Sequence, residues 1–153
     1  MKQTYLASDE KINLSIAIAE RERALLSQLD YKNGYSLYIG IPFCPSTCLY
    51  CSFTSYPLTA WKTQVDAYLD ALEKELDYVA AKNYHRKLNS IYIGGGTPTT
   101  LEPYQLDRLI RKIRCSFDLG DWLEFTVEAG RPDSITEEKL LVLRKNGDRK
   151  STR

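Results

Sequence analysis

Hydrophobic and polar positions along the chain follow a helical rhythm in four segments. The rhythm is clearest over residues 62–82, where apolar side chains recur every three or four positions opposite a charged face. That apolar stripe consists of Val65, Tyr68, Leu69, Leu72, Leu76 and Val79. Helices are also predicted over 9–29, over a segment that begins at Pro103, and over one that begins near Thr136 and stops before Gly147.

Short runs of β-branched and aromatic residues separate the helical segments and predict three strands, over 35–40, 90–93 and 123–127. Strands that alternate with helices are typical of α/β folds, in which the strands are parallel and each connection crosses over the sheet. Residues 145–153 show no strand pattern. We therefore expect a three-stranded parallel sheet with two unprotected edges.

The length of the chain bounds the number of strand–helix units. At roughly 30 residues for each unit of a barrel, the 153 − 34 = 119 residues that follow residue 34 hold three units and the start of a fourth at most. We expect an N-terminal helical segment over 1–34, followed over 35–153 by the truncated front part of a barrel domain.

Charge and hydropathy exclude several classes of partner. The chain has 21 basic and 20 acidic residues, so it carries no large electrostatic field that would attract nucleic acid or an anionic membrane. No apolar run reaches the about 18 residues of a transmembrane helix. The N-terminus also lacks the pattern of a secretory signal, so a cytoplasmic protein is expected.

The unusual residues all follow predicted strands. A loop with three cysteines follows the first strand, a glycine run over 94–96 follows the second, and Glu128 follows the third. In parallel α/β folds, ligands bind at the carboxyl ends of the strands. The sequence therefore predicts that these three features form one site.

The three cysteines, Cys44, Cys48 and Cys51, have uneven spacing. Three thiolates on one short loop can bind three irons of a [4Fe–4S] cluster and leave the fourth iron open. One alternative is a structural zinc site completed by Cys115 or His85, and another is a chance cluster of buried thiols. Cys115 itself is expected to pack as a small hydrophobic residue on its helix.

The glycine run and Glu128 each allow two interpretations. Glycines let a ligand approach the backbone closely, but the same run also suits a tight turn between strand and helix. A nucleoside triphosphate loop is disfavoured, because no Gly-Lys-Ser/Thr follows. Glu128 is either a ligand-binding carboxylate or a structural one, which faces solvent or pairs with Arg131.

Together these residues resemble the radical S-adenosylmethionine (SAM) superfamily, and within it the oxygen-independent coproporphyrinogen III oxidase family. The resemblance rests on YIGIPFCPSTCLYC over 38–51, GGGTPT over 94–99 and TVEAGRPD over 126–133. It implies a partial (β/α)6 TIM-like barrel, of which about three β-α units are present here after the N-terminal helix. The best-known members have His where Gly40 stands and a further Cys where Phe53 stands.

The resemblance also implies a role for individual residues. Three of them, Cys44, Cys48 and Cys51, match the ligands of a [4Fe–4S] cluster whose open iron binds SAM. The positions that match contacts to SAM are Tyr38, Tyr50, Gly95, Gly96, Thr97 and Glu128.

The activity implied is the cleavage of SAM for the oxidative decarboxylation of coproporphyrinogen III to protoporphyrinogen IX in haem biosynthesis. Its partners would be a porphyrinogen substrate and an electron donor of unknown identity. The sequence also allows two alternatives, a haem-binding or haem-trafficking relative of the same family and a small structural zinc-binding module.

Overall fold

The protein is described here by a computed structural model, which covers residues 2–120 and 124–146 and the backbone of 150–152. The chain forms two compact units, Met1–Lys32 and Asn33–Arg153. In the first unit, α1 (Lys2–Tyr5) precedes α2 (Asp9–Leu26), which ends three residues before the predicted boundary. Neither helix buries any of its described residues within the chain.

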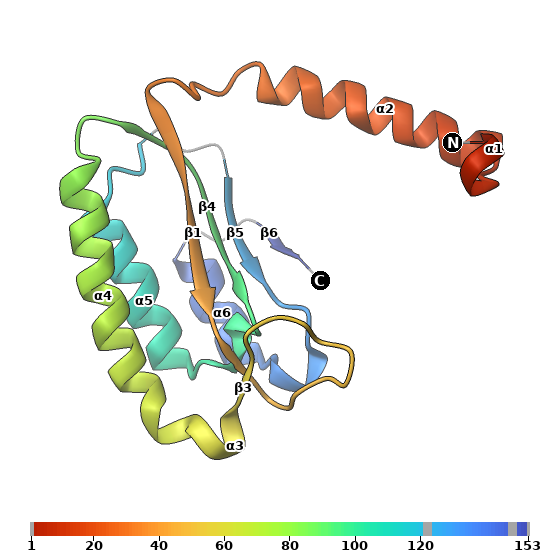
Figure 1. The fold of residues 1–153 in the computed structure, drawn as a ribbon. Helices are drawn as coiled ribbons and strands as arrows, with labels where there is room; N and C mark the ends of the chain where they lie inside the picture. Colours follow the sequence, from red (N-terminus) through yellow and green to blue (C-terminus); the bar gives the residue numbers. More distant parts are fainter. Residues whose placement is uncertain (1, 121–123, 147–149, 153) are drawn as a thin grey trace. The chain divides into compact units, whose positions relative to one another are not determined.

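The second unit is built on a parallel sheet (Figure 1). Its strands are β1 (Gly34–Ile41), β4 (Lys87–Gly95), β5 (Glu124–Glu128) and β6 (Lys150–Thr152), in that order across the sheet. The predicted α/β class and the three parallel strands are confirmed.

The expectation that no strand forms within 145–153 is wrong, because Lys150–Thr152 pairs in parallel with Thr126–Glu128. A run of Lys, Ser and Thr carries no alternating apolar pattern, so the sequence gives no sign of this strand and only its backbone pairing with β5 reveals the strand. Residues 147–149 and 153 of that segment lie outside the described residues, as does residue 123 of the predicted third strand.

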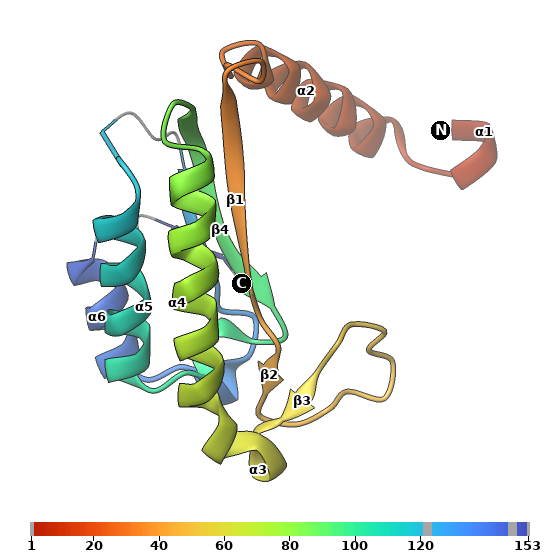
Figure 2. The same ribbon diagram turned by 60° about the vertical axis from the view of Figure 1, so that its left-hand side comes forward.

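Three long helices lie on one face of this sheet (Figure 2). They are α4 (Val65–Lys82), α5 (Pro103–Ser116) and α6 (Glu137–Lys145). Thr136 caps α6 by accepting a hydrogen bond from the Lys139 amide, as the predicted start of this helix requires. Short elements precede the helices and complete the connections: β2 (Phe43–Cys44), β3 (Tyr56–Pro57), α3 (Leu58–Trp61) and the 3₁₀ turns Lys62–Gln64, Pro98–Thr100 and Pro132–Ser134.

The core lies between the sheet and these helices. Alternate strand residues point into it, and they meet the apolar stripes of α4 and α5. Its most completely buried members include Ile39, Ile41, Leu69, Ile91, Ile93, Leu106, Leu109, Ile110, Ile113 and Val127. The intervening residues, such as Tyr38 and Tyr92, point to the opposite face, here called the open face.

Cys115 does not pack as predicted. Its side chain is exposed on α5, while the buried stripe of that helix runs through Leu106, Leu109, Ile110 and Ile113. Cys115 lies two residues after Ile113, about 200° around the helix, so it falls outside the stripe. Among the described residues, no helix is both long enough and apolar enough to span a membrane.

Candidate functional site

The carboxyl ends of β1, β4 and β5 lie side by side and bring the three predicted features together. Ile41 at the end of β1 pairs with Gly95 of β4, and Ile93 of β4 pairs with Val127 of β5. The next residue on each strand therefore lies at the same edge of the sheet. This edge is where the chain leaves the sheet to form its long loops (Figure 1).

The first feature is the cysteine loop, residues 44–55. Pairing of Phe43 with Tyr56, and a hydrogen bond of 2.8 Å from the Tyr56 amide to the Pro42 carbonyl, close this loop at its base. All three thiols are free; that of Cys44 is buried, and those of Cys48 and Cys51 are half-buried. A closed base fixes where the loop begins and ends, so the three thiols are confined to one region.

The second feature is the glycine turn, residues 94–97. Gly95 has a φ of +106°, a conformation that favours glycine. The amides of Gly96 and Thr97 donate to the carbonyls of Ile41 (2.8 Å) and Phe43 (2.9 Å). A Cβ on Gly96 would lie 2.9 Å from Cys44 Sγ, so the turn packs directly against the start of the cysteine loop.

The Thr97 hydroxyl strengthens that junction. Its Oγ1 donates to Cys44 Sγ at 3.4 Å, and both side chains are buried. The glycine turn therefore contacts one of the predicted cluster ligands through the side chain of Thr97 and leaves no room for a side chain between Gly96 and the same thiol.

The third feature is Glu128 at the end of β5. The Tyr92 hydroxyl donates to Glu128 Oε1 at 2.6 Å, and this hydrogen bond is the main reason that the pKa of Tyr92 rises to about 12. Both groups fold over Gly94, where a Cβ would lie 2.7 Å from the Tyr92 ring and 2.9 Å from Glu128 Oε2. Tyr92 therefore fixes the position of the carboxylate.

Sequence reasoning missed Tyr92, although one signal could have identified it. Tyr92 precedes Gly94 by two positions, so strand alternation places it on the same face as the glycine and as Tyr38 of the neighbouring strand. The two tyrosine rings are stacked, with centroids 5.8 Å apart and an interplanar angle of 11°.

Arg131 is the second residue that was missed as a site residue, since the sequence suggested it only as a partner of Glu128. Its guanidinium instead binds Asp133 with two hydrogen bonds, of 3.1 and 2.7 Å, and reaches Cys48 Sγ at 3.4 Å. The hydrogen bonds to the Asp133 carboxylate raise the pKa of Arg131 above its ordinary value, and the same bonds from the guanidinium lower the pKa of Asp133. The motif that could have identified it is Gly-Arg-Pro-Asp directly after the third strand.

One cavity of about 510 Å³ joins these groups. Its lining contains seven of the nine residues predicted for the site: Cys44, Cys48, Cys51, Gly95, Gly96, Thr97 and Glu128. Tyr92, Arg131 and Phe53 also line it. The predicted fourth zinc ligands, His85 and Cys115, do not line it.

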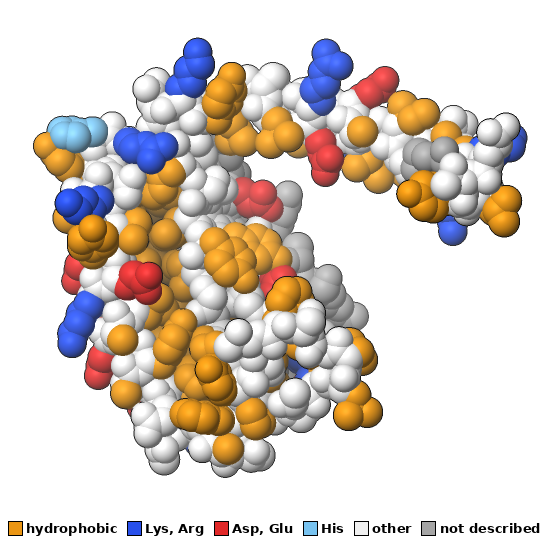
Figure 3. All heavy atoms as spheres, viewed as in Figure 1, with side chains coloured by type: hydrophobic (Ala, Val, Ile, Leu, Met, Phe, Trp, Pro, Cys, Tyr) orange, Lys and Arg blue, Asp and Glu red, His pale blue; other side chains and the backbone are white. Residues whose placement is uncertain are grey.

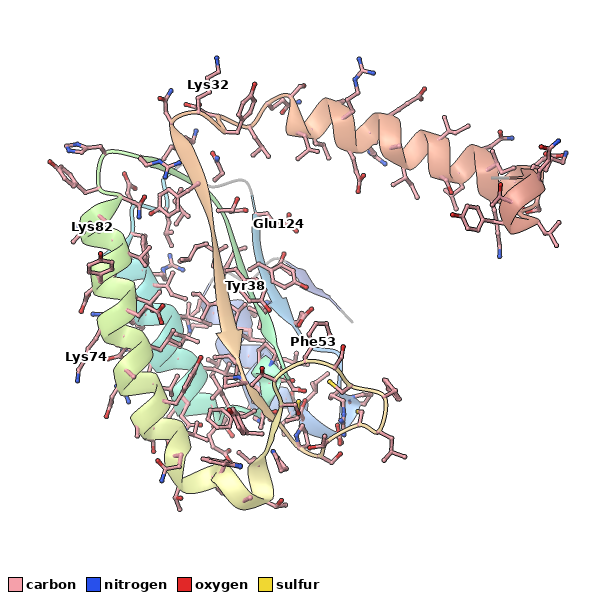
Figure 4. All side chains as sticks on the ribbon, in the orientation of Figure 1. Lys32, Tyr38, Phe53, Lys74, Lys82 and Glu124 are labelled. Atoms are coloured by element: carbon pink, nitrogen blue, oxygen red, sulfur yellow. The ribbon has the colours of Figure 1, made fainter. Side chains whose placement is uncertain are left out.

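Two predicted residues lie outside that lining. Tyr38 is 63% exposed on the open face of β1 and Tyr50 is 90% exposed in the cysteine loop. Figure 4 shows Tyr38 on this face, with Phe53 in the loop beyond it. Hydrophobic side chains gather over the open face and around the loop (Figure 3).

Within the described residues, no three His, Cys, Asp or Glu side chains converge as ligands of a single metal ion. A cluster makes a different demand, because each thiolate binds a different iron at its own corner. The observed set of three soft sulfur donors around one cavity suits such a group.

Comparisons with known proteins identify the family of the chain. Residues 38–151 match the model of the radical SAM superfamily. The oxygen-independent coproporphyrinogen-III oxidase-like protein HemZ of Bacillus subtilis is 43% identical over 149 residues, which cover 95% of this chain and 30% of HemZ. The heme chaperone HemW of the same organism is 44% identical over 116 residues, or 73% of this chain and 29% of HemW. The chain thus spans about 30% of the length of these relatives.

A solved structure supports the fold as well. Coproporphyrinogen III oxidase (HemN) from Escherichia coli, described as a radical SAM enzyme, superposes with a TM-score of 0.67 and 34% identity over 76% of this chain and 26% of HemN. The predicted barrel-type α/β fold therefore matches part of the HemN barrel. The chain belongs to the radical SAM superfamily and, within it, to the coproporphyrinogen oxidase-like family of HemN, HemZ and HemW.

Proposed function

We propose that Cys44, Cys48 and Cys51 bind a [4Fe–4S] cluster and leave one iron open for SAM. The observation that carries this proposal is the set of three free thiols from one closed loop around a single cavity. When bound, the cluster supplies the electron that cleaves a carbon–sulfur bond of SAM. Because thiolate ligation needs reduced cysteines, the proposal includes a reducing, cytoplasmic setting.

Glu128 and the glycine turn form the proposed contacts to SAM. The carboxylate of Glu128 lines the cavity and can accept hydrogen bonds from the ammonium group of the cofactor. Gly95, Gly96 and Thr97 line the same cavity. Tyr38 and Tyr50 lie outside the lining, so we propose that they contact parts of SAM that extend beyond the cavity.

The proposed substrate is a porphyrinogen, namely coproporphyrinogen III, which would undergo oxidative decarboxylation to protoporphyrinogen IX. Its support is the similarity to HemN, a coproporphyrinogen III oxidase. A second candidate is a haem-binding role, because the identity to the chaperone HemW (44%) exceeds that to the E. coli oxidase (36%).

The cluster is tested by anaerobic reconstitution of the chain with iron and sulfide. We expect a brown protein with about four irons per chain, the content of a [4Fe–4S] cluster. Changing Cys44, Cys48 or Cys51 to Ser should lower the iron content sharply, whereas the control Cys115→Ala should retain it. Zinc in place of iron after reconstitution with both metals, or an equal loss of iron in Cys115→Ala, would contradict the assignment.

Binding of SAM is tested by calorimetry on the reconstituted chain. Glu128→Gln removes a charge-assisted contact worth about 1.5–3 kcal/mol, so the affinity should fall by roughly one to two decades. The matched control is Glu124→Gln, because Glu124 lies on the same strand, binds the Thr126 hydroxyl at 2.8 Å and does not line the cavity. Equal affinities of both variants would mean that SAM binds elsewhere.

The oxidase role and the haem-binding role are distinguished by experiments on the full-length protein that contains this sequence. An oxidase should convert coproporphyrinogen III to a product with vinyl groups, in a SAM-dependent reaction. A haem chaperone should bind haem stoichiometrically and form no such product.

A further inference from the structure

Arg131 has a role that the proposed ligand set leaves unexplained. Its guanidinium divides its donors between two loops. Nε and Nη2 bind Asp133 at 3.1 and 2.7 Å, while Nη1 donates to the Ser46 carbonyl at 3.3 Å and to Cys48 Sγ at 3.4 Å. Nη2 also donates to Ser46 Oγ at 3.1 Å. One planar group therefore joins the loop after β5 to the cysteine loop.

A short turn holds this guanidinium in place. Residues Pro132–Ser134 form a 3₁₀ turn in which the Ser134 amide and hydroxyl both donate to the Arg131 carbonyl, at 3.0 and 2.7 Å. The turn therefore fixes the position of Asp133, two residues after Arg131, and its two carboxylate oxygens accept hydrogen bonds from Nε and Nη2 of the guanidinium. The contact with Cys48 is thus aimed by local structure.

The three thiols differ in the groups that donate to them. Cys44 Sγ accepts a hydrogen bond from the neutral Thr97 hydroxyl at 3.4 Å, whereas Cys48 Sγ receives a cationic donor. Cys51 Sγ lies 4.0 Å from the Phe53 carbonyl, which is itself an acceptor. Among the described residues, a charged donor lies within hydrogen-bonding distance of Cys48 Sγ, and the groups beside Cys44 Sγ and Cys51 Sγ are neutral.

We propose that Arg131 is a positioning residue that donates to the Cys48 thiolate and raises the reduction potential of the cluster. This inference rests on the proposed function. Adding one electron to a cluster increases its negative charge, and hydrogen bonds to the sulfurs stabilise that reduced form. A guanidinium provides both a fixed donor and a permanent positive charge.

The competing interpretation is that Arg131 only fastens the two loops together. Such a role would affect the stability and the iron content of the chain but would leave the potential of a loaded cluster unchanged. The potential therefore separates the two roles.

The experiment compares Arg131→Met, Arg131→Lys and the control Arg111→Met after reconstitution of the full chain. Arg111 is a matched cation, because it also binds a carboxylate, Asp107, at 2.7 Å, but it lies on α5 away from the cavity lining. The readouts are iron content and the midpoint potential of the one-electron couple, titrated with a chemical reductant and followed by electron paramagnetic resonance.

Arg131→Met should shift the reduction equilibrium about tenfold toward the oxidised form, which corresponds to a potential about 59 mV lower for one electron. Arg131→Lys keeps the positive charge but loses the planar set of guanidinium donors, so it should lower the reduction potential by less than Arg131→Met does. Arg111→Met should match the unmodified chain.

A fully loaded Arg131→Met variant with an unchanged potential would overturn the inference and leave the proposed cluster intact. If that variant fails to load, the loaded Arg131→Lys variant decides, since a potential equal to that of the unmodified chain would also overturn it. Failure of the unmodified chain to bind a cluster is a different result, and it would contradict the proposed function itself.

Discussion

Replacing Gly96 with Ala should separate the glycine turn from the cysteine loop. A Cβ at this position would lie 2.8 Å from the Phe43 carbonyl oxygen, 2.9 Å from Cys44 Sγ and 3.1 Å from the Ile41 carbonyl oxygen. Two of these three atoms belong to the backbone, so no side-chain rotation can make room. The strand end and the loop must move apart instead.

The cost follows from the contacts that this movement breaks. Overpacking costs about 1–3 kcal/mol. The amides of Gly96 and Thr97 donate across the same junction, at 2.8 and 2.9 Å, and each such bond contributes about 0.5–1.5 kcal/mol. Alanine also lowers the conformational entropy of the unfolded chain, and this effect offsets about 0.4–1 kcal/mol of the loss in stability. We expect the free energy of unfolding to fall by about 1–6 kcal/mol.

Gly130→Ala is the matched control, because Gly130 lines the same cavity and a Cβ there would meet no atom within 4 Å. Urea denaturation followed by circular dichroism gives both free energies, and iron content after reconstitution reports the loop. Gly96→Ala should lose stability and iron, and Gly130→Ala should lose neither. If the free energies of unfolding of the two variants agree within about 0.5 kcal/mol, the glycine turn does not depend on the close approach of Gly96 to the cysteine loop.

Three further predictions concern other groups of the molecule. Tyr92 should ionise near its pKa of about 12 in the unmodified chain and nearer 10 in Glu128→Gln, as measured by magnetic resonance of ring-labelled tyrosine; an unchanged value would exclude the hydrogen bond. Lys139→Met removes donors to the Thr99 and Ser134 carbonyls and should cost about 1.5–3 kcal/mol of unfolding free energy at neutral pH. Burial lowers the pKa of Lys139 in the folded chain below 10.5, the ordinary value that it keeps in the unfolded chain. The unfolded chain therefore binds more protons between these two pKa values, and the free energy of unfolding should increase as the pH rises through this range. An increase of the same size in Lys139→Met would contradict this cause. The exposed apolar residues of the open face and loop should make the chain self-associate in size-exclusion chromatography, and a stable monomer at high concentration would refute this.

The sequence predicted the elements that depend on local patterns. The apolar stripe of α4 is long and regular, and its members Val65, Leu69, Leu72 and Leu76 are all buried. The meeting of the three strand ends was predictable for a different reason, since parallel strands direct their carboxyl ends to one edge. Cys115 could also have been placed correctly, because it lies outside the stripe of its own helix.

The contacts between loops could not be predicted in the same way. Arg131 and Cys48 are 83 residues apart, and Tyr92 and Glu128 are 36 apart. Periodicity shows which face of an element is buried, but it does not show which polar side chains from different loops meet. β6 escaped prediction on similar grounds, because its pairing with β5 depends on tertiary placement and not on its own sequence.

The glycine run illustrates how one motif can serve several physical demands at once. Gly94 leaves room for the Tyr92 ring and the Glu128 carboxylate, Gly95 supplies the positive φ, and Gly96 admits the Phe43 carbonyl and Cys44 Sγ. The sequence left open whether these glycines serve a ligand or a tight turn. In the structure their missing side chains make room for the protein's own groups, which include Glu128, a proposed contact to SAM, and Cys44, a proposed cluster ligand. The run therefore acts on the site by positioning Glu128 and Cys44, and any side chain introduced there should disturb the site even where it touches no cofactor.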